Sequence, residues 1–243
     1  MIALLFLLGG VSGLWIRYYL TGFASSLNKD VYNTYIEIFP DNPPHFVPDS
    51  AILTPLKCGA NWRYFLAGGI FFAGLYVCYP SFLLVCVIGL FFILCFTISV
   101  IDWHYQLISP ALCQGLLVLG IFSAWQNINS ISLDDALIST FTAWSLFFLL
   151  FYLARFIYQK EAFGRGDYWL ITALATFIHW QTLPLFILLS CLFALCYAVY
   201  QKLRKQSIKK QIPFAPFLCL AMMAVWVINW VDLDLFSVYN FNH

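Results

Sequence analysis

Apolar residues run along this chain in long blocks that are separated by short polar segments. A membrane-spanning helix needs roughly 20 mostly apolar residues. Blocks close to this length are found at residues 1–20, 64–79, 81–101, 110–125, 136–158 and 213–231, and a longer one at 168–200. The pattern therefore predicts an all-α polytopic membrane protein.

The block at 168–200 is too long for one ordinary span. As a single helix, its 33 residues would extend about 50 Å, whereas the hydrocarbon core of a bilayer is about 30 Å thick. Polar residues at 179–182 and Pro184 interrupt its middle. Proline disfavours a helical conformation at the residue before it. The block alone is compatible with one over-long helix or with two short helices joined by a turn.

The positions of the basic residues decide between these alternatives, because Lys and Arg collect in cytoplasmic loops. With two helices in the long block and the N-terminus outside, the inside segments are 21–63, 102–109, 159–167 and 201–212. All 12 Lys and Arg then lie in these segments or, for Arg17 and Arg155, at the inner ends of spans. The outside segments carry aspartates and no basic residue. We therefore expect about eight transmembrane helices, with both termini on the outer, periplasmic side.

The composition supports the same class of protein. The chain is 63% hydrophobic and only 9% charged, whereas an ordinary soluble domain carries about 25% charged residues. So few charged side chains cannot cover a soluble globule of this size. The composition excludes a soluble enzyme, a disordered chain and a nucleic-acid binder with a basic face.

This topology divides the chain into four parts. We expect a first transmembrane helix at 1–20, a cytoplasmic loop at 21–63, a membrane domain at 64–231 and a short outer tail at 232–243. Residues 1–20 lack the basic residues that precede the apolar core of a secretory signal, so we interpret them as a retained span. The loop at 21–63 is rich in proline, and we expect it to be irregular, without a core of its own.

Two aspartates adjoin long apolar blocks on the same side of the predicted membrane domain. Asp102 directly follows the block at 81–101, and Asp167 opens the sixth span. Ionisable residues at membrane depth are costly and usually functional. Two neighbouring carboxylates can share a proton and activate water, which is the chemistry of aspartic peptidases. Asp102 and Asp167 are therefore the candidate catalytic residues.

The helix ends suggest how these aspartates divide their roles. Asp167 is expected at a helix N-terminus, which favours negative charge, and Asp102 near a helix C-terminus, which does not. This reasoning predicts that Asp167 holds the charge and Asp102 the proton.

The glycines before Asp167 add to this picture. Gly164 and Gly166 allow close approach of another chain and unusual backbone angles. An extended segment here could pair with an extended substrate, so both are candidate substrate-positioning residues. The alternative is a plain turn in which Asp167 caps a helix and Asp102 is a polar residue at the end of a span.

The residues around these aspartates resemble the motifs of the type IV prepilin peptidases, which are GxGD-type aspartic membrane peptidases. The match extends over residues 60–220 and consists of the following segments in order: Arg63-Tyr64; Ile101-Asp102 with Gln106-Leu107 and Pro110; Gly164-Arg165-Gly166-Asp167; Trp180-Gln181 with Leu183-Pro184-Leu185; and 212–218. Ala215 stands where the last motif has glycine, and Trp169 where a lysine is usual.

The resemblance implies a peptidase domain at 64–231 with Asp102 and Asp167 as the catalytic pair. It implies an aspartic endopeptidase of the bacterial inner membrane that removes the basic leader from type IV prepilins or pilin-like secretion subunits on the cytoplasmic side. The implied partners are the precursor and the lipid bilayer, and no nucleic acid is expected.

The loop at 21–63 departs from the family pattern. Typical members carry two C-x-x-C pairs there, which bind zinc, whereas this loop has only Cys58. A tetrahedral zinc site needs four ligands, so we expect no metal site and no zinc. Many members also N-methylate the new N-terminus with S-adenosylmethionine, an activity associated with this loop. Proteolysis is expected to need no cofactor, and S-adenosylmethionine only if methylation is retained.

Three alternatives stay open on sequence grounds. One is another GxGD-type intramembrane peptidase with a different client. Another is a transporter or ion-binding protein that uses Asp102 and Asp167 as carriers, although transporter sites usually lie near the bilayer midplane. The third is a catalytically degenerate paralogue.

Overall fold

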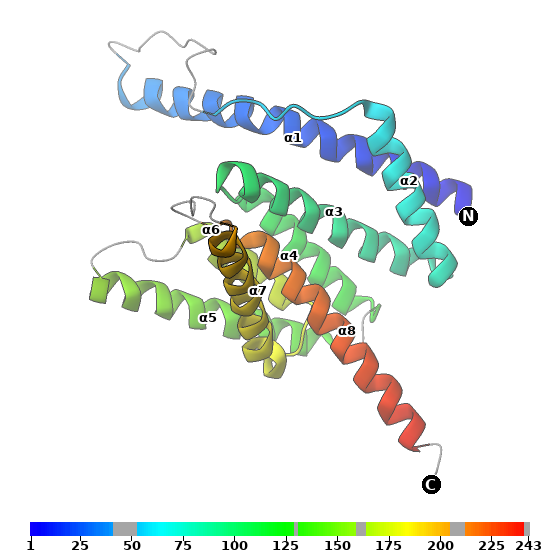
Figure 1. Ribbon diagram of the computed structural model, residues 1–243. Coiled ribbons are helices and arrows are strands. Elements are labelled where there is room, and N and C mark those ends of the chain that lie inside the picture. The colour runs from blue at the N-terminus through cyan, green and yellow to red at the C-terminus, as the bar shows by residue number, and fades with distance from the viewer. Residues whose placement is uncertain (41–52, 129–130, 159–163, 205–211, 241–243) are drawn as a thin grey trace. The chain divides into compact units, whose positions relative to one another are not determined.

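The computed structural model describes residues 1–40, 53–128, 131–158, 164–204 and 212–240, and every regular element within these ranges is helical. The elements, labelled in Figure 1, are α1 (Ile2–Ile38), α2 (Asn61–Cys78), α3 (Phe82–Tyr105), α4 (Pro110–Trp125), α5 (Leu133–Tyr158), α6 (Arg165–Ala175), the 3₁₀ turn η2 (Trp180–Thr182), α7 (Leu183–Leu203) and α8 (Ala215–Asn240).

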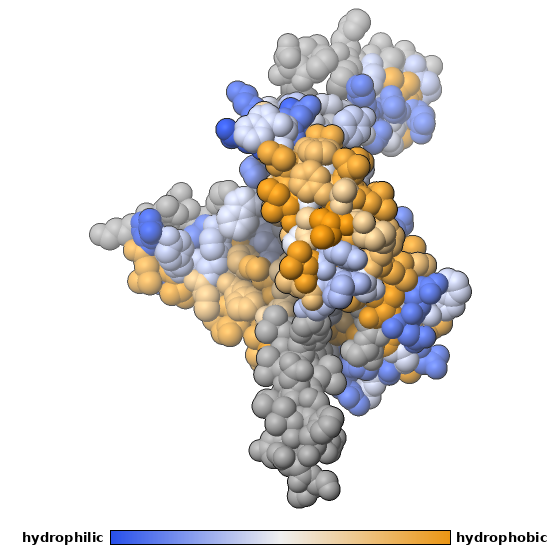
Figure 2. Space-filling model, turned by 90° about the vertical axis from the view of Figure 1, so that its right-hand side faces the viewer, coloured by the Kyte–Doolittle hydropathy of each residue, from blue (hydrophilic) through white to orange (hydrophobic). Residues whose placement is uncertain are grey.

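Several of these helices have the length and composition of membrane spans. Within the described ranges four segments meet both conditions: Ile2–Ile38, Phe82–Tyr105, Leu133–Ile157 and Trp180–Leu203. Large apolar side chains such as Leu149, Phe156 and Leu188 are exposed, and Figure 2 shows broad hydrophobic areas on the face that it draws. Apolar outer surfaces suit a lipid environment. The all-α polytopic class is confirmed.

The chain forms two compact units, Met1–Gly89 and Leu90–His243, which divide inside α3. In the first unit, α1 and α2 pack with their backbones in direct contact. A Cβ on Gly9 would collide with the carbonyl oxygen of Gly68, and a Cβ on Gly13 with that of Tyr64. Small residues four positions apart permit this approach between apolar helices.

Helix α1 is longer than the expected first span. It continues through residues 21–38, which were predicted to belong to an irregular loop. The reason is that no proline precedes Pro40, so nothing interrupts the hydrogen-bond ladder before that point. Most of the prolines of the predicted loop lie at 41–52, outside the described residues.

The second unit is built around α6. The side chains from Leu170 to Ile178 are buried, and α6 packs against α4, α5 and α8. Phe91 of α3, Phe177 and Trp226 of α8 form an aromatic cluster in which the centroid of Phe91 lies 4.8 Å from Phe177 and 4.6 Å from Trp226. The indole N–H of Trp226 donates to the carbonyl oxygen of Phe177 at 3.1 Å.

The break predicted in the block at 168–200 is confirmed. Helix α6 ends at Ala175 and α7 begins at Leu183. Hydrogen bonds of the 3₁₀ type tighten the end of α6, from Thr176 N to Ala173 O and from Phe177 N to Leu174 O. With 11 residues, α6 is about 16 Å long, roughly half the thickness of a bilayer core.

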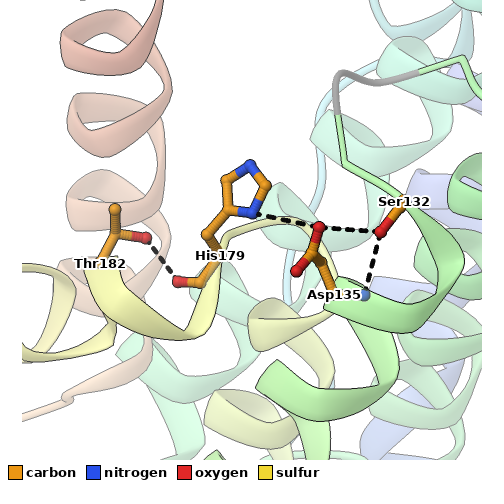
Figure 3. A network of polar contacts seen from close by, with 4 residues as sticks. All are labelled: Ser132, Asp135, His179 and Thr182. Carbon is orange, nitrogen blue, oxygen red and sulfur yellow. Dashed lines mark hydrogen bonds and ion pairs between the residues drawn. The ribbon is translucent and has the colours of Figure 1, made fainter.

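The turn between α6 and α7 contacts the start of α5 through polar side chains, as Figure 3 shows. Ser132 and Asp135 cap α5: the amide of Asp135 donates to Ser132 Oγ at 3.1 Å, and that hydroxyl donates to Asp135 Oδ2 at 2.8 Å. His179 Nδ1 lies 3.6 Å from the same Oδ2. The Thr182 hydroxyl donates to the His179 carbonyl at 2.7 Å. This network lies beyond the opposite end of α6 from Asp167.

Candidate active site

Asp102 lies in the last turn of α3, at the position that the apolar pattern predicts. Asp102 is only 5% exposed. The backbone N–H of Ala215, the first residue of α8, donates to Asp102 Oδ2 at 2.9 Å. The backbone N–H of Phe214 also interacts with this carboxylate. A buried carboxylate needs such donors, and here they join the end of α3 to the beginning of α8.

Asp167 lies in the first turn of α6 and is partly buried. Gly164 is the N-cap residue of this helix and has an extended backbone, with φ −68° and ψ 132°. A Cβ on Gly164 would lie 2.9 Å from Asp167 Oδ2. A larger residue at this position would therefore press on the carboxylate.

The two aspartates lie within electrostatic reach, because the charge of Asp102 acts on Asp167. The packing of Gly166 sets the start of α6 against the segment that follows Asp102. A Cβ on Gly166 would lie 2.7 Å from the Cβ of Ile108, in the segment that links α3 to α4. Glycine thus lets the start of α6 rest on the chain that follows Asp102. The candidate residues Asp102, Asp167, Gly164 and Gly166 come together in the second unit.

Three buried thiols belong to the helices that form this site. Cys95, Cys113 and Cys219, from α3, α4 and α8, are buried, and Cys219 Sγ lies 3.7 Å from the carbonyl oxygen of Cys95. Cys113 interacts electrostatically with Asp167, and Cys219 with Asp102. In the part of the chain that the structure describes, no three His, Cys, Asp or Glu residues form a group suited to a metal ion.

Sequence reasoning missed the contact made by Ala215. It noted the segment 212–218 as a motif but gave it no role. The available signal was the pair Pro213 and Pro216 on either side of Phe214-Ala215. Proline is favoured at the beginning of a helix, and the first amides of a helix have no partner within it. What the sequence did not indicate was which acceptor these amides meet.

Comparison with known proteins places this chain in a family. The model of the type IV leader peptidase family matches residues 89–199. The prepilin leader peptidase/N-methyltransferase of Haemophilus influenzae is 39% identical over 226 residues, which cover 93% of this chain and 96% of that protein. This chain belongs to the type IV leader peptidase family.

Other leader peptidases match over a smaller part of the chain. The prepilin leader peptidase/N-methyltransferase of Legionella pneumophila is 35% identical over 54% of this chain and 47% of its own length. That of Escherichia coli K12 is 32% identical over 59% of this chain and 65% of its own length. No solved structure matches the chain.

The region matched by the leader peptidase family begins where the second compact unit begins, at residues 89 and 90 respectively. It contains both Asp102 and Asp167. Ala215 lies beyond its end, although α8 completes the surroundings of Asp102.

Proposed function

We propose that this leader peptidase is an aspartic endopeptidase that cleaves the basic leader from type IV prepilins or pilin-like secretion subunits. Family membership and the names of its relatives support the substrate class. The observation that supports the catalytic part is the electrostatic interaction between Asp167, in the first turn of α6, and the buried Asp102 at the end of α3.

The proposed chemistry follows from the pair of carboxylates. Two carboxyl groups that lie close together do not both ionise easily, so one holds a proton while the other is charged. A water molecule between them loses its proton to the charged carboxylate and attacks the scissile carbonyl. The other carboxyl group, which is protonated, donates its proton to the substrate. The peptide C–N bond breaks, and the products are a carboxylic acid and an amine.

We propose that α1 to α8 are the eight helices of the membrane topology, with both termini outside. The distribution of Lys and Arg supports this orientation. Asp102 and Asp167 then lie on the cytoplasmic side of the bacterial inner membrane, where the leader of a precursor would be. A precursor helix would lie in the bilayer beside the enzyme.

Gly164 and Gly166 are proposed to position the substrate. The extended backbone of Gly164 supports this role, because an extended segment offers N–H and C=O groups to an extended peptide. The close packing of Gly166 on Ile108 gives that residue a structural role as well.

The proposed activity is proteolysis without a bound metal. The zinc site of the typical family members does not fit this chain, because the segment 21–63 has Cys58 as its single cysteine. The relatives' names include N-methyltransferase activity. For this chain the mass of the product is the test, since methylation by S-adenosylmethionine adds one methyl group to the new N-terminus.

A cleavage assay in membranes tests the function. A prepilin-type precursor is incubated with the unaltered protein, with Asp102→Ala and with Asp167→Ala. We expect the unaltered protein to shorten the precursor and each variant to lose this activity. A second precursor, in which the glycine before the cleavage site is replaced, separates two kinds of peptidase. A prepilin peptidase should depend on this glycine, whereas a related peptidase with another client should not. If the correctly inserted unaltered protein leaves the precursor intact, the chain is a degenerate paralogue or has a different client.

A further inference from the structure

The contact between Asp102 and Ala215 bears on a question that the proposed function leaves open, namely which aspartate holds the proton. Ala215 is the first residue of α8 and is fully buried. The first N–H groups of a helix have no acceptor within it. That of Ala215 donates instead to Asp102 Oδ2 at 2.9 Å.

A hydrogen bond donated to a carboxylate stabilises its ionised form. The N-terminus of α8 adds the positive end of a helix dipole. Both act on Asp102, which is otherwise shielded from water. Its own helix, α3, would disfavour a charge at this end. The direct bond from α8 opposes that effect, and it was not visible in the sequence.

Asp167 has different surroundings. It is partly buried, and the negative charge of Asp102 acts on it. Burial disfavours a charge on both carboxylates. At Asp102 the backbone N–H groups of Ala215 and Phe214 act against this effect, whereas at Asp167 the charge of Asp102 adds to it. The N-terminus of its own helix, α6, favours negative charge at Asp167, but a first-turn dipole is a weaker and more diffuse influence than a direct N–H bond.

We propose that the backbone N–H of Ala215 keeps Asp102 as the ionised member of the pair, so that Asp167 carries the shared proton. This inference rests on the proposed function and deepens it. It reverses the assignment that the dipoles of α3 and α6 alone suggest. Ala215 is then a positioning residue, since its amide acts on the reaction through Asp102.

The reaction can be followed with this assignment. Asp102 takes a proton from water as the water oxygen bonds to the scissile carbon, and Asp167 gives its proton to the carbonyl oxygen. When the C–N bond breaks, the proton on Asp102 passes to the leaving nitrogen. One hydroxyl of the intermediate returns a proton to Asp167. One water is consumed, and both carboxyl groups end in their starting states.

The other titratable groups near the pair include His104, whose Nδ1 lies 2.9 Å from the carbonyl oxygen of Val100, and three thiols. Cys219 of α8 interacts electrostatically with Asp102 and Cys113 of α4 with Asp167, and Cys95 of α3 lies beside Cys219. A protonated thiol is neutral and does not decide which aspartate is charged. The electrostatic interaction within the pair is that of the Asp102 charge with Asp167.

Ala215→Pro tests the inference, with Ala215→Gly as the control. Proline has no N–H and is tolerated at the first position of a helix, whereas glycine keeps the donor. The cleavage rate is measured against pH. Loss of a hydrogen bond to a charged group corresponds to roughly a 10- to 100-fold change in the ionisation equilibrium, or about one to two pH units. We expect the acid limb of the proline profile to move to higher pH, with the alkaline limb unchanged and the glycine profile like that of the unaltered protein.

Two results would overturn the assignment. If the alkaline limb moves outward while the acid limb stays, Asp102 is the group that ionises second and Asp167 is the base. If neither limb moves in a proline variant that is folded and inserted, the amide of Ala215 has a structural role alone.

A second measurement needs neither activity nor the proline variant. Infrared spectra of the full-length protein follow the carboxylic acid band in Asp102→Asn, which retains Asp167, and in Asp167→Asn, which retains Asp102. Each remaining aspartate then titrates beside a neutral amide. We expect the acid band to persist to higher pH when Asp167 remains. The reverse order contradicts the inference even if no precursor is cleaved, so failure of the inference and failure of the proposed function are distinguishable.

Discussion

Gly166 lies against Ile108 so closely that a Cβ on the glycine would be 2.7 Å from the Cβ of Ile108. Real Cβ atoms do not approach other carbons to this distance without movement of the backbone. The contact joins the first turn of α6, which carries Asp167, to the segment that follows Asp102 in the chain. The spacing of the two carboxylates therefore depends on the absence of one side chain.

Gly166→Ala is expected to lower the cleavage rate by roughly 100-fold, because a displacement of about 1 Å in a catalytic group has effects of this size. The matched control is Gly115→Ala in α4, where an added Cβ meets nothing within 4 Å. Rates per inserted protein are compared in the membrane assay. Ile108→Ala should not restore activity, because the closest contact is with the Cβ that alanine retains. Full activity of Gly166→Ala would contradict this account of the site.

Gly120 has a comparable role in the packing of α4 on α6. A Cβ at this position would collide with Thr176 and meet Phe177 at 2.9 Å. Overpacking of this kind costs about 1–3 kcal/mol. We expect Gly120→Ala to lower the free energy of unfolding, measured in detergent, by that amount. Gly115→Ala on the same helix should leave stability unchanged or raise it slightly, since alanine is a better helix former than glycine.

The sequence predicted well where most of the helices lie along the chain, because the features that determine their positions are local. Apolar blocks, the break before Pro184 and the basic residues each act through a few neighbouring positions. The break in the block at 168–200 was found where expected. The error at residues 21–38 came from counting the prolines of the whole segment, whereas the position of the first one, Pro40, decides where α1 ends.

The site was predicted only in part. Asp102 and Asp167 stand out because charged residues beside apolar blocks are costly. The hydrogen bond from Ala215 to Asp102 joins residues that are 113 positions apart. No local pattern indicates which acceptor the first amide of α8 will meet. The same holds for Gly166. A side chain is excluded at this position because Ile108, a residue of another segment, packs against it.

The pair formed by His179 and Asp135 should contribute little to stability. Its side chains are 38% and 37% exposed, and the two atoms are 3.6 Å apart. Exposed ion pairs are worth about 0–1 kcal/mol. We expect His179→Gln to change the free energy of unfolding by no more than this and to leave the cleavage rate unchanged. Asp135→Ala should cost more, because Asp135 also accepts the Ser132 hydroxyl in the cap of α5. A large loss of cleavage activity in His179→Gln would contradict this expectation and would mean that the turn between α6 and α7 contributes to the reaction.

Cleavage is expected to need no bound zinc. A tetrahedral structural site takes four ligands, and the segment 21–63 supplies Cys58 as its single cysteine. Metal analysis of the purified protein should give zinc far below one equivalent. A chelator should leave cleavage unchanged, and Cys58→Ser should retain activity. Stoichiometric zinc that is lost together with activity on chelation would contradict this expectation.

The dependence of cleavage on pH should show two ionisations, one on each side of the optimum. In the proposed mechanism the reactive pair holds one proton. At low pH both carboxyl groups are protonated and no base is present. At high pH both are ionised and no acid is present. Since Asp102 and Asp167 interact, the two apparent values belong to the pair. The profile of kcat/KM should therefore be bell-shaped. A profile with a single ionisation, measured with the protein inserted and stable across the range, would mean that one carboxylate acts alone and that the pair is not the catalytic unit.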